Sequence, residues 1–460
     1  MPKQGVWILI ASALVLFPKI LLSQPPDTIW TRRYNDPSNR NDCAFASAVD
    51  SVGDIYIVGT IYNSPDKFLI IKYNGSTGDT IWTRSFNGPA NRGDQAFGCT
   101  IDNAGFLYVT GSYYDGSYTS SQTIKYNKTN GDTVWVRRFR YTFKSCSAVG
   151  CIVDRLGNLF VVGLYNSADF LTIKYNADTG DTLWVRIYDS PYNGYDCTQS
   201  CSVDTIGGLY VTGYSYNGVN DDYLTIKYNA SNGDTVWTRR FNGPANGYDE
   251  ARSCSVDDAG NLYVTGYSRD SSASDNYLTI KYNATTGDTI WTRRYKSPFN
   301  YLDDANTCIV DHFGNLYVSG TCCNDLYNYY YILTIKYNAV TGDTVWTCPY
   351  INQVHSGDWA RSCSADRSGD LYIIGYTANG STADYLIIKY NTATGVTGKP
   401  TYPIADSKLQ LAQNKPNPFS QSTVIRYQLP ASGPASIKIY NTAGQIVKKI
   451  DMGSQQAGRH

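Results

Sequence analysis

Aspartates recur along the chain at a spacing that would place several carboxylates around one opening. Six of them lie eight residues before a second recurring aspartate: Asp42, Asp94, Asp196, Asp249, Asp303 and Asp358. The third copy has Cys146 at this position. A ring of such carboxylates could bind a cation or sugar hydroxyls, so the six are our candidate ligand-binding residues. The alternative, which we favour, is that each accepts backbone N–H bonds from its own loop, as in Asx turns.

Cysteines also recur, but their pattern favours packing over chemistry. Six of them lie three residues before the second aspartate: Cys99, Cys151, Cys201, Cys254, Cys308 and Cys363. We interpret them as small apolar residues where strands crowd together. No closely spaced Cys/His set recurs, which argues against zinc. Because His312 and His355 also lie in unlike contexts, we assign no catalytic residue, no metal ligand and no cofactor.

The element that must position these residues is a repeat built on lysine and tryptophan. A Lys-Tyr-Asn stretch is followed, ten residues after its lysine, by a tryptophan in six copies that open at Lys72, Lys125, Lys174, Lys227, Lys281 and Lys336. Trp30 has the tryptophan half alone, and Lys389 has the lysine half alone. A chain that begins with the second half of a repeat and ends with the first half can close into a ring.

Each repeat divides into four short segments that read as strands. In the fifth copy they span 251–257, 261–267, 277–283 and 288–295, each rich in β-branched and aromatic residues and bounded by Gly, Asn or Asp. Seven such units of about fifty residues predict an all-β fold, a seven-bladed β-propeller of four-stranded blades. The segment 27–34 would be the outermost strand of the seventh blade, which protects an open sheet edge.

The repeat resembles a known family. LYVTGYSRDSSASDNYLTIKYNATTGDTIWTRRY (262–295) resembles the bacterial β-propeller repeat called SBBP, which is found in secreted and surface proteins. The likeness extends over about residues 27–396, within a propeller that we place at 24–396. It implies the fold and no single activity, because propellers host many functions.

The N-terminus reads as an export signal. Residues 1–23 contain a lysine, an apolar run from Val6 to Phe17, and Leu21 and Ser23 at the positions that precede a signal-peptide cut. An uncleaved hydrophobic anchor is the alternative, although twelve apolar residues are too few to span a bilayer. No later segment is long and apolar enough to do so. We therefore expect no transmembrane segment.

The C-terminus resembles a second family. After a Gly/Pro/Thr-rich linker at 397–407, residues 408–460 contain NKPNPFSQST, IRYQLP and IKIYNTAGQIV, which resemble the sorting domain of type IX secretion cargo. Strands are expected at 424–429 and 435–440, with a turn at 441–444. The resemblance implies an immunoglobulin-like β-sandwich, here truncated because the family's last strands and basic tail do not follow. The sequence is then either a fragment, which we favour, or it contains an incomplete sorting domain. It also implies the type IX secretion machinery as a partner and a secreted or outer-surface location.

The net charge and the position of the variable loops limit the classes of function that the sequence favours. Lys plus Arg and Asp plus Glu both number 39, so nothing favours nucleic acid or an anionic membrane as a partner. Connections of variable length gather on one end of the ring, the loop-rich face, where binding usually occurs. We expect a monomeric, non-catalytic scaffold that binds a glycan or a protein there.

Three alternatives remain. The first is a polysaccharide hydrolase or lyase that uses Asp on the same face, with Asp221–Asp222 and Asp303–Asp304 as the close pairs. The second is a quinoprotein dehydrogenase, because KYNATTGDTIW resembles the tryptophan-docking stretch of that family and Cys322–Cys323 its vicinal pair. Those propellers have eight blades and an acidic calcium site, for which Glu250 is the only glutamate here. The third is a structural repeat without a ligand.

Overall fold

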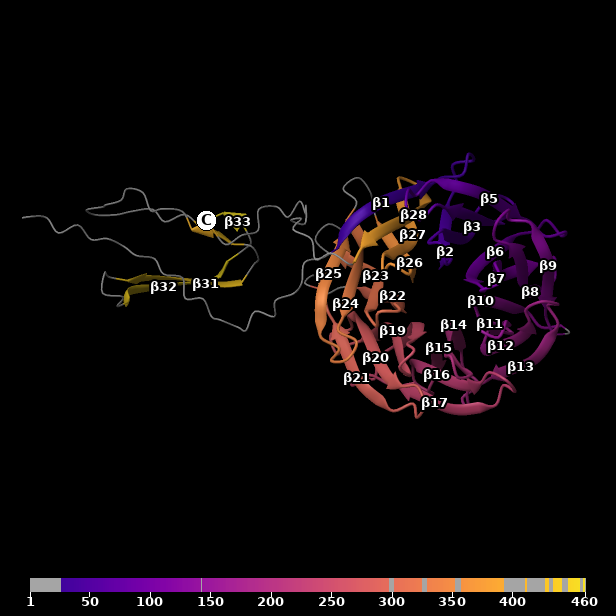
Figure 1. Ribbon diagram of the computed structural model, residues 1–460. Helices are drawn as coiled ribbons and strands as arrows, with labels where there is room; N and C mark the ends of the chain where they lie inside the picture. Colours follow the sequence, from indigo (N-terminus) through magenta and orange to yellow (C-terminus); the bar gives the residue numbers. More distant parts are fainter. Residues whose placement is uncertain are drawn as a thin grey trace, which may run out of the picture. The chain divides into compact units, whose positions relative to one another are not determined.

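The computed structural model describes residues 26–141, 143–297, 302–324, 329–351 and 357–392, together with five short strands after residue 409. Every regular element among them is a β-strand. The strands of 27–391 form seven four-stranded antiparallel sheets, arranged as blades around a centre (Figure 1). The prediction of a seven-bladed propeller is therefore confirmed.

The blades follow one another along the chain, each running from the inner to the outer strand. Blade one contains β2 (Asp42–Val49), β3 (Ile55–Ile61), β4 (Lys67–Tyr73) and β5 (Thr80–Phe86). Blades two and three contain β6 (Asp94–Ile101), β7 (Phe106–Tyr114), β8 (Thr119–Asn127) and β9 (Thr133–Phe139), then β10 (Cys146–Val153), β11 (Asn158–Tyr165), β12 (Asp169–Asn176) and β13 (Thr182–Tyr188). Blades four and five contain β14 (Asp196–Val203), β15 (Gly208–Tyr216), β16 (Asp221–Asn229) and β17 (Thr235–Phe241), then β18 (Asp249–Val256), β19 (Asn261–Arg269), β20 (Asp275–Asn283) and β21 (Thr289–Tyr295). Blade six contains β22 (Asp303–Val310), β23 (Leu316–Asn324), β24 (Tyr329–Tyr337) and β25 (Thr344–Tyr350).

Blade seven is assembled from both ends of the propeller sequence. It contains β26 (Asp358–Ala365), β27 (Leu371–Asn379), β28 (Thr382–Asn391) and, as its outer strand, β1 (Asp27–Tyr34). The pairing of β1 with β28 is antiparallel and places Trp30 opposite Lys389. This is the register of the other blades, where Lys227 lies opposite Trp237. The predicted closure of the ring by 27–34 is confirmed.

The hydrophobic core is divided into seven clusters, one between each pair of neighbouring blades. The cluster between blades four and five, for example, contains Tyr210, Trp237, Leu262 and Ile280. Every blade thus packs on both of its faces. This explains why the middle strands are apolar on both sides instead of alternating.

A second set of contacts ties each blade to the next and explains the lysine–tryptophan spacing. The carbonyl oxygen of Ala284 in blade five accepts hydrogen bonds from three groups of blade four: Lys227 Nζ at 2.9 Å, Trp237 Nε1 at 3.3 Å and Tyr210 OH at 3.1 Å. Equivalent sets of three donors meet at the carbonyls of Ala177, Ala339 and Gly75. We call this contact the inter-blade latch.

The arginine two residues after the tryptophan strengthens the latch. Arg239 lies over the ring of Trp237 at 5.7 Å and donates from Nε to Gly287 O at 2.9 Å. The arginine therefore stacks on the tryptophan of its own blade and forms a hydrogen bond to the next blade.

Loss of one latch is expected to destabilise the ring measurably. Substituting Lys227→Met keeps the length of the side chain but leaves Ala284 O with two donors and Asp204, 3.9 Å from the ammonium, without its cation. We expect the free energy of unfolding to fall by about 1–3 kcal/mol, measured by urea denaturation. Thr238→Ala, on the exposed face of the same blade, is the control and should change it by less than about 0.5 kcal/mol. An unchanged stability for the lysine variant would contradict the latch.

The second unit of the chain is described only in part. The first unit comprises Leu22–Thr397. In the second, β29 (Gln410–Leu411), β30 (Tyr427–Leu429) and β33 (Gly458–Arg459) form one sheet, and β31 (Gly433–Tyr440) pairs with β32 (Ile446–Gln455). The expected strand 435–440 lies within β31, and only 427–429 of the expected strand 424–429 is described. The turn at 441–444, the linker 397–407 and the signal 1–23 lie outside the described residues. Among these residues no helix is long and apolar enough to cross a membrane.

Candidate functional site

The six candidate aspartates begin the inner strands at the loop-rich face, and all are at most 2% exposed: Asp42, Asp94, Asp196, Asp249, Asp303 and Asp358. In four of them Oδ2 accepts the amide of the residue six positions earlier, at 2.5–2.7 Å: Asp42, Asp196, Asp249 and Asp303. Asp94 accepts the Gly88 amide in the same way. Burial raises the pKa of Asp42 to about 6. These carboxylates shape the loops between blades, and a direct ligand contact by them stays a prediction.

The cysteines are buried or half-buried and unbonded to one another. Cys151, Cys254, Cys308 and Cys363 belong to the clusters between blades, which confirms their interpretation as small apolar residues. Burial raises the pKa of Cys201 and Cys363 to about 12, so their thiols are poor nucleophiles. The vicinal Cys322 and Cys323 are buried in β23.

A pocket formed by blades five, six and seven is lined by charged side chains and aromatic rings. The cavity has a volume of about 340 Å³, and we call it the three-blade pocket. Its walls are supplied by Arg252, Leu302, Asp304, Asn306, Thr321, Tyr330, Trp359, Arg361 and Tyr376. The inner strands β18, β22 and β26 contribute Arg252, Asn306 and Arg361 at the same repeat position, three residues after the buried aspartate.

One wall of the pocket is an aromatic platform. Trp359 and Tyr376 lie opposite each other in the pairing of β26 with β27 and stack with ring centroids 5.0 Å apart and an interplanar angle of 24°. The ring of Tyr330 also packs against Trp359, with centroids 5.4 Å apart. Arg361 lies over the Tyr376 ring and donates from Nη2 to its hydroxyl at 3.0 Å. The platform is half-buried, so part of each ring remains accessible.

Blades five and six contribute further charged groups to the pocket. Arg252 Nη2 forms an ion pair with Glu250 Oε2 at 2.8 Å, and its guanidinium lies over Tyr267. Burial raises the pKa of Asp304 to about 6, with Arg252 opposing the shift and Glu250 among the acids that add to it. Asp304 Oδ1 and Arg252 Nε have no hydrogen-bond partner. Both atoms are buried, so a donor and an acceptor in this part of the pocket are unpaired within the protein.

The three-blade pocket is the part of the ring where the repeats differ from one another. At the position occupied by Arg252, Asn306 and Arg361, the first three blades have Phe45, Phe97 and Val149. Phe45 and Phe97 contact each other at 5.3 Å. Of the residues that line this pocket, only Asp304 was predicted from the sequence, in the pair Asp303–Asp304, because the other candidates were aspartates that recur in six of the seven repeats. The pattern that could have indicated the site is an inner-strand position at which the type of residue changes from blade to blade.

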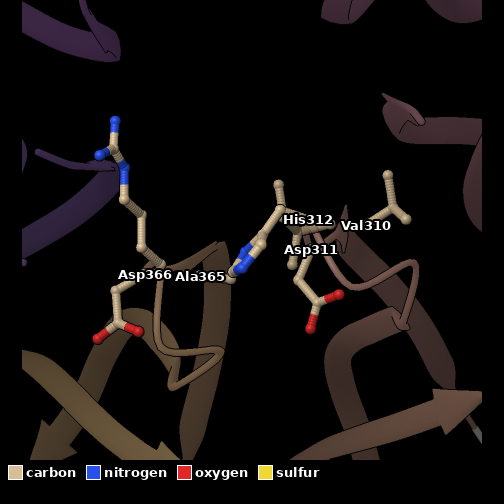
Figure 2. A pocket seen from close by; sticks show the side chains of 7 residues that line it. Val310, Asp311, His312, Ala365 and Asp366 are labelled. Carbon is tan, nitrogen blue, oxygen red and sulfur yellow. The ribbon is translucent and has the colours of Figure 1, made fainter. Parts of the chain in front are cut away.

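Two other cavities lie at the opposite end of the ring, where the turns are tight. The larger, of about 380 Å³, lies between the inner strands of blades six and seven, and His312 extends across it toward Ala365 (Figure 2). The acidic residues that line this cavity interact with other groups of the protein. Asp311 accepts the Asn315 amide at 2.8 Å, and Asp366 lies 3.3 Å from Lys389. The smaller, of about 200 Å³, is likewise lined by turn residues of blades three to five, such as Asp154 and Asp204.

Comparison with known proteins supports the fold. Residues 236–270 match the SBBP β-propeller repeat family. Among solved structures, the WD40 repeats of RRP9 superpose with a TM-score of 0.51 at 9% identity, over 80% of this chain and 99% of that chain. A quinohemoprotein alcohol dehydrogenase from Pseudomonas putida gives 0.46 at 11% identity, over 82% and 77%. No curated protein matches the chain in sequence. Such similarity shows a β-propeller and no specific function.

Proposed function

We propose that the protein is a non-catalytic binding module that takes a carboxylate-bearing glycan into the three-blade pocket. The observation that carries this proposal is the stacked pair Trp359–Tyr376 beside Arg361. Aromatic faces offer a flat apolar surface to the C–H groups of a sugar ring. Arginine is the side chain best suited to hold a carboxylate through two parallel hydrogen bonds.

The composition of the rest of the pocket supports a sugar over an apolar ligand. Asn306 and Asp304 provide a donor and acceptors for hydroxyl groups. The ion pair with Glu250 leaves Arg252 Nε without a partner. Few convergent polar groups around an aromatic surface are typical of specific small-ligand sites. A protein ligand that inserts an acidic residue is the other class of ligand for the same chemistry.

The proposal can be tested by calorimetry on the full chain with two oligosaccharides of equal length, one made of uronic acids and one neutral. Trp359→Ala is expected to weaken binding of the uronic oligosaccharide at least about tenfold, since loss of a stacking surface costs on the order of 1.4 kcal/mol. Phe45→Ala, which removes an inner-strand aromatic ring from blade one, at the repeat position of Arg361, should leave the affinity unchanged. Equal binding of both oligosaccharides, or no effect of the tryptophan variant, would refute the proposal.

Binding of an anionic sugar should depend on pH through Asp304. With a pKa of about 6, its carboxyl gains a proton between pH 7 and pH 5 and stops competing for Arg252. A uronic carboxylate stays ionised over this range, because ordinary carboxyl groups titrate near pH 4. We expect the affinity to rise about twofold to fivefold on acidification, a modest effect because the site is partly solvated. Asp304→Asn should reduce this dependence, and an affinity that falls with acidification would contradict the assignment.

A polysaccharide hydrolase or lyase is the second candidate, favoured by one observation. Asp221 also has a pKa raised to about 6, by burial first and then by Glu250, so two acids near Glu250 titrate where general acid catalysis is efficient. Release of reducing ends or unsaturated products from an acidic polysaccharide, abolished in Asp304→Asn, would establish catalysis. Binding without turnover would support the module.

We also propose export, on the basis of the two chain ends. Residues 1–23 would direct the chain across the inner membrane, and residues 408–460 would engage the type IX secretion machinery as a partial immunoglobulin-like sorting domain. The expected location is secreted or outer-surface. The test is expression in a host with that machinery: deletion of 408–460 should leave the propeller in the periplasm, and surface display without this segment would refute the assignment.

A further inference from the structure

Three carboxylates converge at the loop-rich face between blades three and four. Asp169 begins β12, Asp189 follows β13, and Asp196 begins the inner strand β14 of the next blade. One carboxylate oxygen from each lies within 4.8 Å of the others. The cluster lies in a different blade pair from the three-blade pocket, so it is independent of the proposed function.

The Asp196 carboxylate is fully buried and only half satisfied. Its Oδ2 accepts the Ser190 amide at 2.6 Å, whereas Oδ1 has no hydrogen-bond partner. The hydroxyl oxygen of Ser190, also buried, has no partner either. A buried polar oxygen without a partner costs free energy. The same oxygen is unpartnered in Asp42, Asp249 and Asp303, and in blade three two further carboxylates lie beside it.

In blade four an arginine neutralises the equivalent position. In blade four, Asp222 occupies the place of Asp169, and Arg240 Nη1 contacts it at 3.3 Å. Blades two and five have Arg138 and Arg294 at that place in the outer strand, whereas blade three has Ile187.

The place of Asp189 is also distinctive, since the other blades have no acid there: Asn35, Asn87, Arg140, Asn242, Lys296 and Ile351. Blade three therefore has a carboxylate at a place where the other blades have none, and it has isoleucine where blades two, four and five have arginine.

We propose that Asp169, Asp189 and Asp196 bind a calcium ion that fastens the outer strands of blade three to the inner strand of blade four. Calcium takes oxygen ligands at about 2.3–2.6 Å, so two of its ligand oxygens lie at most about 5 Å apart, which the cluster satisfies. Carboxylates from separate loops also suit the flexible coordination of calcium better than the strict octahedron of magnesium. Backbone carbonyls and water would complete the shell.

The test is calcium binding to the full chain after removal of divalent ions with a chelator, followed by calorimetry and thermal melting. We expect a single calcium site and a rise in melting temperature of at least about 2 °C at saturation, with a smaller response to magnesium. Asp189→Asn, which restores the residue of blades one, four and seven, should abolish both signals. Asp384→Asn, at the place of Asp169 in blade seven, should keep them.

A further variant distinguishes a cation site from general destabilisation. Ile187→Arg supplies the arginine that blade four uses, so it should raise the melting temperature of the calcium-free chain and remove the response to calcium. Absence of calcium binding to the unmodified chain would overturn the proposal. So would an Asp189→Asn variant that binds calcium as the unmodified chain does.

Discussion

A chain that lacks β1 is expected to lose at least about 5 kcal/mol of its free energy of unfolding. Trp30 is 8% exposed, and removal of a buried tryptophan alone costs about 3–5 kcal/mol. Its Nε1 also donates to Gly75 O at 3.2 Å, so the latch between blades seven and one is lost with it. Urea denaturation measures the effect, and Trp30→Ala should reproduce most of it.

Deletion of β1 also leaves β28 as an open edge. Residues 385–388 of this strand are fully buried and apolar, and an exposed apolar edge pairs with other chains. We therefore expect concentration-dependent association in size-exclusion chromatography. A chain of unchanged stability and size would show that the ring does not depend on closure by β1.

A permuted chain provides the control. In sequence, Asn391 and Gly395 correspond to Asn283 and Gly287, which flank the turn before β21. Residues 27–34 placed directly after Gly395 should therefore pair with β28 through an ordinary repeat turn. This chain is expected to recover the stability that the deletion removes, which would separate loss of the strand from loss of the N-terminus.

Gly266→Ala is expected to be among the most destabilising single substitutions, at about 3 kcal/mol or more. A Cβ at this position would lie 1.9 Å from the carbonyl oxygen of Glu250 and 2.8 Å from the hydroxyl of Tyr223. The first contact is with the backbone of the paired inner strand, which cannot move without breaking the sheet ladder. The same close approach recurs at Gly59, Gly111, Gly163, Gly213, Gly320 and Gly375.

The control for this substitution is a glycine of an inner strand. At Gly150 the nearest atom to an added Cβ is Val162 Cγ2 at 3.5 Å, an ordinary contact, so Gly150→Ala should change stability by less than about 0.5 kcal/mol. Urea denaturation measures both effects, and we expect a lower midpoint for Gly266→Ala than for Gly150→Ala. Equal midpoints would mean that the close approach is relieved without cost.

Sequence reasoning predicted the ring because the requirements of a blade repeat at fixed intervals. The pairing of Lys227 with Trp237 follows from the register of two neighbouring strands. Because the same sequence pattern occurs in each repeat, the correct assignment of one repeat predicts all seven blades. The latch acceptor could not be predicted in this way. Ala284 lies 57 residues after Lys227, and nothing within a single repeat indicates which carbonyl of the next blade the ammonium reaches.

The candidate site was harder to predict for a related reason. The recurring aspartates, such as Asp249, recur because five of the loops between blades make the same hydrogen bond from a backbone amide to this carboxylate. Trp359 has no counterpart at its position in the other blades, and its proximity to Arg252 depends on the curvature of the ring across three blades. A pattern that repeats in every blade indicates residues that stabilise the fold. A ligand site in a ring of repeats is formed by residues that differ from one blade to another.

The antiparallel register of β1 with β28 has a mechanical consequence. Asp27 lies opposite Asn391, so the chain enters and leaves blade seven at the same end of one strand pair. A pulling force applied between the two ends of the propeller sequence would act across the first hydrogen bonds and peel β1 from β28 one pair at a time. Under tension the ring would open at this seam before any of the other blades yields.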